Sequence, residues 1–99
     1  MYVNYRSIDN AAQARLSILV PWLLPVGQHS GSEWVALNPT RDDKNLGSFR
    51  INLSSGKWSD FAVENAKGIG AISLVSYIRQ ISKNEAARVV ARFVGGGYE

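Results

Sequence analysis

The spacing of apolar residues changes once along this chain, and that change limits the possible folds more than any other feature. Between residues 48 and 61, apolar side chains alternate with polar ones, which is typical of a strand with one buried face. Between residues 72 and 93, apolar residues recur at helical spacing, as on one side of a helix. A chain of 99 residues supports one hydrophobic core. We therefore predict a single α+β domain over residues 1–99.

The predicted sheet is small and antiparallel, a meander built around one hairpin. Its first strand covers residues 33–37 and stops before Pro39, because proline cannot extend a hydrogen-bonded ladder. The alternation predicts a second strand over residues 48–53. A Ser-Ser-Gly turn at residues 54–56 then leads into a third strand over residues 57–61.

One N-terminal helix and two C-terminal helices are predicted to pack on one face of this sheet. The N-terminal helix covers residues 8–20, where apolar residues recur at roughly helical spacing. Pro21 is expected to end or kink it near Leu19, because proline lacks a backbone donor. The polar residues 28–32 are predicted to form a loop that leads to the sheet.

The two C-terminal helices follow Gly70. The apolar stripe of the first consists of Ile72, Val75, Ile78 and Ile81. Ser82 and Glu85 match a capping box, in which two side chains satisfy free amides at the start of the second helix. Three glycines from Gly95 onward are expected to end that helix.

The titratable residues do not gather in a pattern that supports catalysis or metal binding. His29 is the single histidine and lies in a Gly/Ser loop, so we interpret it as a surface imidazole. Asp42 and Asp43 are flanked by Arg41 and Lys44, which favours a solvated loop over a metal site. The absence of cysteine excludes disulfides and thiolate metal sites. We therefore expect no enzymatic activity, no metal, no cofactor and no small-molecule substrate.

Hydropathy and charge give no indication of a membrane protein. The longest apolar stretch, residues 18–26, contains two prolines and is far shorter than the roughly 20 residues of a membrane span. The first residues lack the basic and apolar segments of a signal peptide. Lack of cysteine fits a reducing compartment, so a cytoplasmic location is expected. The net charge of +3 allows an anionic partner but gives the domain only a weak field.

A glycine-rich segment, residues 67–70, opens the first C-terminal helix and resembles a fragment of a phosphate-binding loop. It lacks the full Gly-x-x-x-x-Gly-Lys-Ser/Thr spacing of that motif. A structural role for these glycines is therefore favoured.

The length of the hairpin turn decides where Trp58 points. With a three-residue turn, Phe49, Ile51 and Phe61 face the core. Arg50, Asn52, Trp58 and Asp60 then share the outer face, where a tryptophan beside an arginine would form a platform for stacking. With a two- or four-residue turn, Trp58 instead lies opposite Leu53 and belongs to the core. Both arrangements remain open, whereas Trp34 is expected to be buried.

Several short motifs occur in an order that resembles the N-terminal zinc-binding domain of DnaG-type bacterial and phage primases. These motifs are Leu37-Asn-Pro-Thr40, Lys44-Asn-Leu-Gly-Ser-Phe49, Lys57-Trp-Ser-Asp-Phe61, Gly68-Ile-Gly70 at a helix start, and Glu85-Ala86 in the last helix. The resemblance covers about residues 33–93. It is strongest to the cysteine-less variant of this domain in primase-like proteins of phages and mobile elements.

The resemblance implies a zinc-ribbon-like fold that lacks zinc. The metal-ligand positions of the family correspond here to Leu37, Thr40, Asp60 and a residue near Val63, which cannot form a thiolate and imidazole site. It also implies a non-catalytic role in recognising single-stranded DNA template. The candidate nucleic-acid-binding residues are Trp58, Arg50, Lys57, Arg41 and Lys44.

The alternative function is docking on, or inhibition of, a primase, helicase or polymerase. An exposed apolar patch would serve that function. The residues expected to form such a patch are Trp22, Leu23, Leu24 and Trp34.

Overall fold

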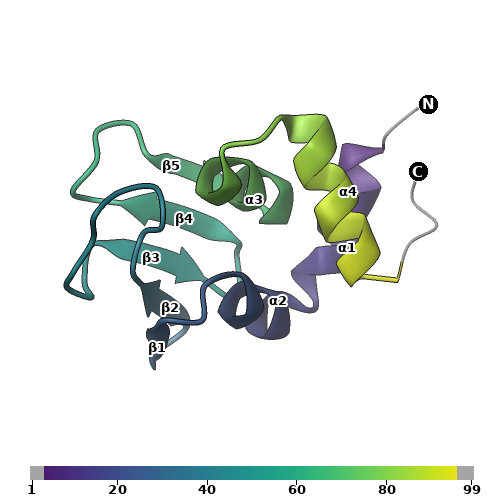
Figure 1. Ribbon diagram of the computed structural model, residues 1–99. Coiled ribbons are helices and arrows are strands. Elements are labelled where there is room, and N and C mark those ends of the chain that lie inside the picture. Colours follow the sequence, from purple (N-terminus) through teal and green to yellow (C-terminus); the bar gives the residue numbers. More distant parts are fainter. Residues whose placement is uncertain (1–3, 96–99) are drawn as a thin grey trace.

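The computed structural model describes residues 4–95, which form an antiparallel sheet and four helices (Figure 1). The elements in chain order are α1 (Tyr5–Gln13), α2 (Leu16–Leu23), β1 (Gly27–Ser30), β2 (Glu33–Ala36), β3 (Phe49–Asn52), β4 (Lys57–Asp60), β5 (Lys67–Ile69), α3 (Ala71–Arg79) and α4 (Lys83–Phe93). The five strands lie in the order β1-β2-β3-β4-β5, which is a simple meander. The predicted α+β class is therefore confirmed.

The N-terminal helical segment is two helices instead of the single helix predicted over residues 8–20. The chain breaks at Ala14 and Arg15, and Pro21 lies inside α2 instead of ending the helix near Leu19. Proline in so short a helix removes one hydrogen bond, and α2 continues past it with a bond from the Leu24 amide to the Val20 carbonyl. Because of this break, α2 is a separate helix, and its buried residues Leu16, Leu19 and Val20 pack into the core.

Strand β1 replaces the loop that was predicted for residues 28–32. It pairs with β2 across a two-residue turn, where Gly31 has a φ of 61°. Such a positive φ suits glycine at the first position of a tight hairpin turn. β1 shows no alternation of apolar residues, because its sequence is Gly-Gln-His-Ser. Its Gly27 and His29 lie against the Trp34 ring of β2. A Cβ at Gly27 would lie 2.7 Å from the Trp34 Nε1 atom.

The β3–β4 hairpin has a four-residue turn, so the register differs by one residue from the three-residue alternative. Ile51 lies opposite Trp58, and Phe49 lies opposite Asp60. The Asn52 side chain fixes this turn by accepting hydrogen bonds from the Ser54 and Ser55 amides at 2.9 and 2.8 Å. The predicted alternation of Phe49 and Ile51 toward the core is confirmed.

The core fills the space between the helices and one face of the sheet (Figure 1). At its centre Trp58 packs on Tyr77, with ring centroids 4.8 Å apart, and Phe49 contacts both rings. Residues that are less than 2% exposed include Ile8, Leu19, Val20, Ile51, Ile72, Leu74, Val75 and Val90. Because all four helices contribute to this one core, they leave the opposite face of the sheet uncovered.

The C-terminal helices follow the sequence prediction closely. Ser82 and Glu85 form the predicted capping box at the start of α4. The start of α3 is capped by a residue that is distant in sequence. The Asp9 carboxylate on α1 accepts a hydrogen bond from the Ile72 amide at 3.0 Å. Of the glycines expected to end α4, Gly96 and Gly97 lie outside the described residues.

Close packing at Gly68 predicts that this position does not tolerate a side chain. A Cβ there would lie 2.2 Å from the Ser73 Oγ atom and 2.8 Å from the Trp58 ring. We expect Gly68→Ala to lower the free energy of unfolding by about 1–3 kcal/mol, because the core must shift. Chemical denaturation measures this, with Lys67→Ala on the same strand as the control. Equal stability of the two variants would contradict the packing described here.

Candidate nucleic-acid interface

The outer face of the sheet, which points away from the helices, gathers a set of polar and basic side chains. Strand alternation places on it, from β2 to β5, Glu33, Val35, Arg50, Asn52, Lys57, Ser59, Lys67 and Ile69. A shallow hollow of about 510 Å³ lies over β2 to β5 and is lined by most of them. In the part of the chain that the structure describes, no helix covers this face (Figure 1).

Pairing across the strands brings the cations of the outer face close together. Arg50 lies opposite Ser59, and Ser59 lies opposite Lys67. Neighbouring strands are about 4.8 Å apart, so the Cα atoms of Arg50 and Lys67 are separated by roughly 10 Å. Lys57 faces Ile69 in the adjacent row.

The outer face has a surplus of positive charge. Arg50 is held in place, because it donates to the Gly47 carbonyl at 2.8 Å and pairs with Glu33 at 3.1 Å. Lys57 and Lys67 take part in none of the salt bridges found within residues 4–95. The outer face therefore carries three basic side chains and one carboxylate, and that carboxylate pairs with Arg50.

The register places an aromatic residue other than Trp58 beside this face. The Phe61 amide donates to the Ser48 carbonyl at 3.0 Å, which continues the ladder one residue beyond β4. Alternation then directs Phe61 to the same side as Lys57 and Ser59, and it is 76% exposed. The three-residue turn predicts that Phe61 faces the core, and this prediction is wrong.

Trp58 cannot form the stacking platform considered for it. Its side chain is 5% exposed, its ring packs on Tyr77, and its Nε1 atom donates to Ser73 at 2.9 Å. Asp60, expected beside it on the outer face, is only 2% exposed. Both corrections follow from the four-residue turn, since a shift of one residue exchanges the two faces of a strand.

Of the five candidate residues, Arg50 and Lys57 lie together on the outer face, but Arg41 and Lys44 lie elsewhere. Lys44 is on an exposed loop, where its ammonium is 3.8 Å from Asp42. Arg41 contacts Asp43 at 3.3 Å and Asp60 at 3.2 Å, so its charge is already neutralised. These pairs confirm the expected counter-charge around the Asp42–Asp43 loop.

Sequence reasoning missed Lys67 and Ile69 as members of this face. Residues 67–70 were interpreted as a helix start, but the first three form β5. A three-residue strand with a central glycine shows no alternation that could reveal it. The anion-binding interpretation of this segment also fails, because the Asp9 carboxylate already occupies the start of α3.

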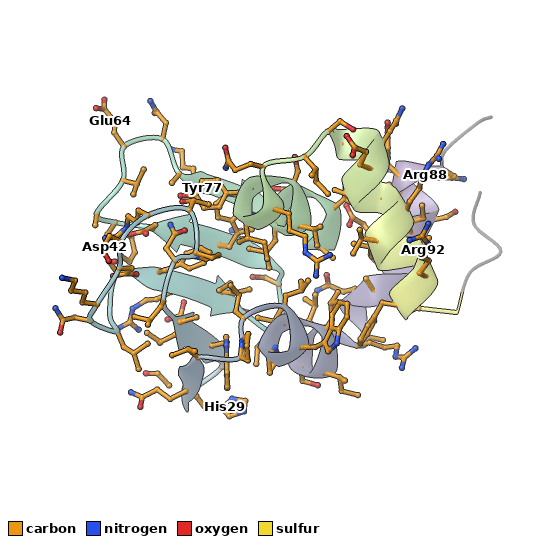
Figure 2. The ribbon with its side chains drawn as sticks, in the orientation of Figure 1. His29, Asp42, Glu64, Tyr77, Arg88 and Arg92 are labelled. Carbon is orange, nitrogen blue, oxygen red and sulfur yellow. The ribbon has the colours of Figure 1, made fainter. Side chains whose placement is uncertain are left out.

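A buried polar network ties the loops at one end of the sheet to α3. We call it the Asn38 network; its members are Asn38, Thr40, Arg41, Asp60 and Tyr77 (Figure 2 labels Tyr77). The Asn38 amide donates to both the Asp60 carboxylate and the Tyr77 hydroxyl, each at 2.8 Å. Thr40 donates to the Asn38 side-chain oxygen at 2.8 Å. No buried side-chain polar atom in the described residues lacks a partner.

The Asn38 network keeps Asp60 ionised although its side chain is buried. Burial alone raises the pKa of Asp60, but hydrogen bonds from Asn38, from the Ala62 amide and from Arg41 outweigh it. The pKa of this carboxyl therefore lies below its ordinary value.

The fold is similar to that of a primase domain. The crystal structure of the Aquifex aeolicus primase, comprising zinc-binding and RNA polymerase domains, matches with a TM-score of 0.74 and 23% sequence identity. The match covers 100% of this chain and 23% of that chain, and it lies in the zinc-binding domain. No family model and no curated protein matched the sequence. At this identity the likeness shows the fold.

The residues present do not fit the zinc ion that this fold implies. Of the positions that the resemblance assigns to metal ligands, Leu37 carries no donor, and Thr40 and Asp60 are engaged in the Asn38 network. Within residues 4–95, no three His, Cys, Asp or Glu side chains cluster as metal ligands.

None of the helices within residues 4–95 has the length and apolarity to cross a bilayer.

The Asn38 network predicts an acid-sensitive contribution to stability. The folded pKa of Asp60 lies below its unfolded value of about 3.9, so the ionised carboxylate stabilises the fold fully at neutral pH. This contribution is lost as the pH falls through the folded pKa. We expect Asp60→Asn to lower the free energy of unfolding by about 1–3 kcal/mol at pH 7 and by less below about pH 4.

Urea denaturation across this pH range measures the difference between wild type and Asp60→Asn. Asp42→Asn is the matched control, because the Asp42 side chain is 87% exposed and should change stability by less than about 0.5 kcal/mol. If the loss of unfolding free energy in Asp60→Asn is the same at every pH, the charge of Asp60 does not contribute to stability.

Proposed function

We propose that this domain is a non-catalytic module that binds single-stranded DNA through the outer face of its sheet. The observation that carries the proposal is a sheet face, free of helices, on which Arg50, Lys57 and Lys67 line a shallow hollow. Binding of single strands commonly combines cations that contact phosphates with apolar or aromatic groups that contact bases. The outer face supplies both kinds of group.

Each residue has a distinct role in this proposal. Lys57 and Lys67 contact phosphates as mobile point charges, whereas Arg50 presents a guanidinium fixed by Glu33. Phe61 offers an exposed ring on which a base stacks, and Ile69, which is 59% exposed, adds an apolar contact. With about three phosphate contacts and one ring, the affinity is modest and depends strongly on salt.

The similarity to a primase supports a place for this module in DNA replication. The chain spans 23% of the matched primase chain, which also contains an RNA polymerase domain. We propose that this chain engages template strands in a primase-like system, in the cytoplasm, while a separate polymerase unit forms the bonds. The cysteine-less primase-like proteins of phages and mobile elements are the proposed context.

The two lysines should account for most of the salt dependence of binding. For a fluorescent 20-nucleotide oligo(dT), we expect log affinity to fall with log salt at a slope of about −2. Lys57→Gln combined with Lys67→Gln should reduce this slope to about −0.7, because one phosphate contact remains. Fluorescence anisotropy measures both, with Lys44→Gln as a control that retains the wild-type slope. An unchanged slope in the double variant would exclude the outer face as the phosphate-binding surface.

Phe61 should contribute to affinity without contributing to stability. Since stacking of one base is worth about 1–3 kcal/mol, Phe61→Ala should weaken oligo(dT) binding by about 5- to 150-fold. Its thermal midpoint should stay close to that of wild type, because the ring is exposed. Ile18→Ala removes a 59% exposed apolar side chain from α2, outside the outer face, and should bind as wild type does. Equal binding by both variants would remove Phe61 from the interface.

A further inference from the structure

A second surface forms where α2, α3 and α4 meet. We call it the arginine–aromatic surface; its members are Arg15, Trp22, Arg79, Val89, Arg92 and Phe93. A hollow of about 290 Å³ lies among the last five of these residues. Trp22 is 54% exposed although it is a large aromatic residue, and Ile18 on the same side of α2 is 59% exposed. Such side chains on a small domain mark a site of interaction.

Arginines surround the two aromatic rings of this surface. The Trp22 and Phe93 rings lie 5.4 Å apart between centroids. The Arg79 guanidinium lies 5.7 Å from the Trp22 centroid, and that of Arg15 lies 5.1 Å from the Phe93 centroid. These contacts hold the guanidinium planes in place while their donor edges remain available to a planar anion.

The positive charge of the protein is concentrated in this helical part. Residues 24–70 carry five basic and five acidic side chains, whereas residues 4–23 and 71–95 carry six basic and two acidic ones. Figure 2 shows Arg88 and Arg92 on α4, at the end of the molecule opposite Asp42 and Glu64. None of the salt bridges found within the described residues involves an arginine of this surface. The surface is therefore complementary to an acidic partner.

We propose that the arginine–aromatic surface docks an acidic segment of a partner protein. A bulky apolar side chain of that segment enters the hollow between Trp22, Val89 and Phe93. Neighbouring carboxylates pair with Arg79 and Arg92, since the guanidinium fork matches a carboxylate in geometry. Tryptophan and arginine are also the residues that most often dominate the energy of protein interfaces.

The contacts already made by the two rings favour a protein over a nucleic acid here. Trp22 has Phe93 and Arg79 as neighbours, and Phe93 has Trp22 and Arg15. A base would have to displace a guanidinium to stack on either ring. A bulky apolar side chain in the hollow, with carboxylates beside it, leaves these contacts intact. The patch considered from the sequence is corrected accordingly, since Leu24 and Trp34 are buried and only Trp22 and part of Leu23 remain.

Three probes test this proposal against the full chain. The first is a synthetic 12-residue peptide of Asp and Glu with a central Phe-Asp-Leu, and the second replaces Phe and Leu by Ser. The third is a 20-nucleotide oligo(dT). The readout is the indole N–H signal of Trp22 in NMR titrations, assigned with Trp22→Phe. We expect saturable shifts with the first peptide, about tenfold weaker binding of the second, and smaller shifts with oligo(dT).

Matched variants then locate the contact. Arg79→Gln combined with Arg92→Gln should weaken binding of the first peptide by about tenfold. Lys44→Gln combined with Lys57→Gln removes the same charge from the sheet side and should weaken it by less than about twofold. No Trp22 shift with either peptide, equal loss in the two double variants, or a larger Trp22 shift with oligo(dT) would each overturn the proposal. The last result would reassign the surface to nucleic acid.

Discussion

Asn52 sets the register of the β3–β4 hairpin by accepting two hydrogen bonds from the turn that follows it. That register determines which side chains of β4 enter the core. Trp58 and Asp60 point inward, where the first anchors the aromatic cluster and the second anchors the Asn38 network. Lys57 and Ser59 point outward, and Phe61 follows them. The core and the proposed binding face therefore both depend on the geometry of one short turn.

The Asn38 network includes Thr40 and Asp60, two of the positions that the sequence resemblance assigns to metal ligands. A metal would cross-link these loops by coordination, whereas here a buried carboxylate, an amide, a guanidinium and two hydroxyls link them by hydrogen bonds. Removing one partner from such a network leaves other buried polar groups unsatisfied, which is costly. The network is therefore cooperative, and its strength depends on the protonation of Asp60.

Regular patterns in the sequence were sufficient for the fold class and for much of the helical half. The alternation around Ile51 and the capping box at Ser82 and Glu85 each involve neighbouring residues, so their physical basis is local. The strands β1 and β5 were missed because they contain little besides glycine and polar residues, and they form only through pairing with a neighbour. The break before α2, at Ala14 and Arg15, is marked by neither proline nor glycine, so no local signal reveals it.

The candidate site was only partly predictable for the same reason. Arg50 was placed on the outer face by alternation, which is local information, whereas Lys57 reaches that face only through the four-residue turn. Trp58 and Phe61 depended on the turn length, and both outcomes were compatible with the sequence. The sequence could not show that Arg41 is paired with Asp60 and so absent from the outer face, because the two residues lie 19 positions apart in the chain.

The core of this domain separates two basic surfaces that do not share a residue. Its radius of gyration is 12.8 Å, so ligands held on the two surfaces would lie within a few nanometres of each other. A strand on the sheet and a protein on the helices would then meet at a high local concentration, and weak contacts at each surface would reinforce one another. In such an arrangement the domain couples its two ligands, and its function depends less on the affinity for either ligand than on binding both at the same time.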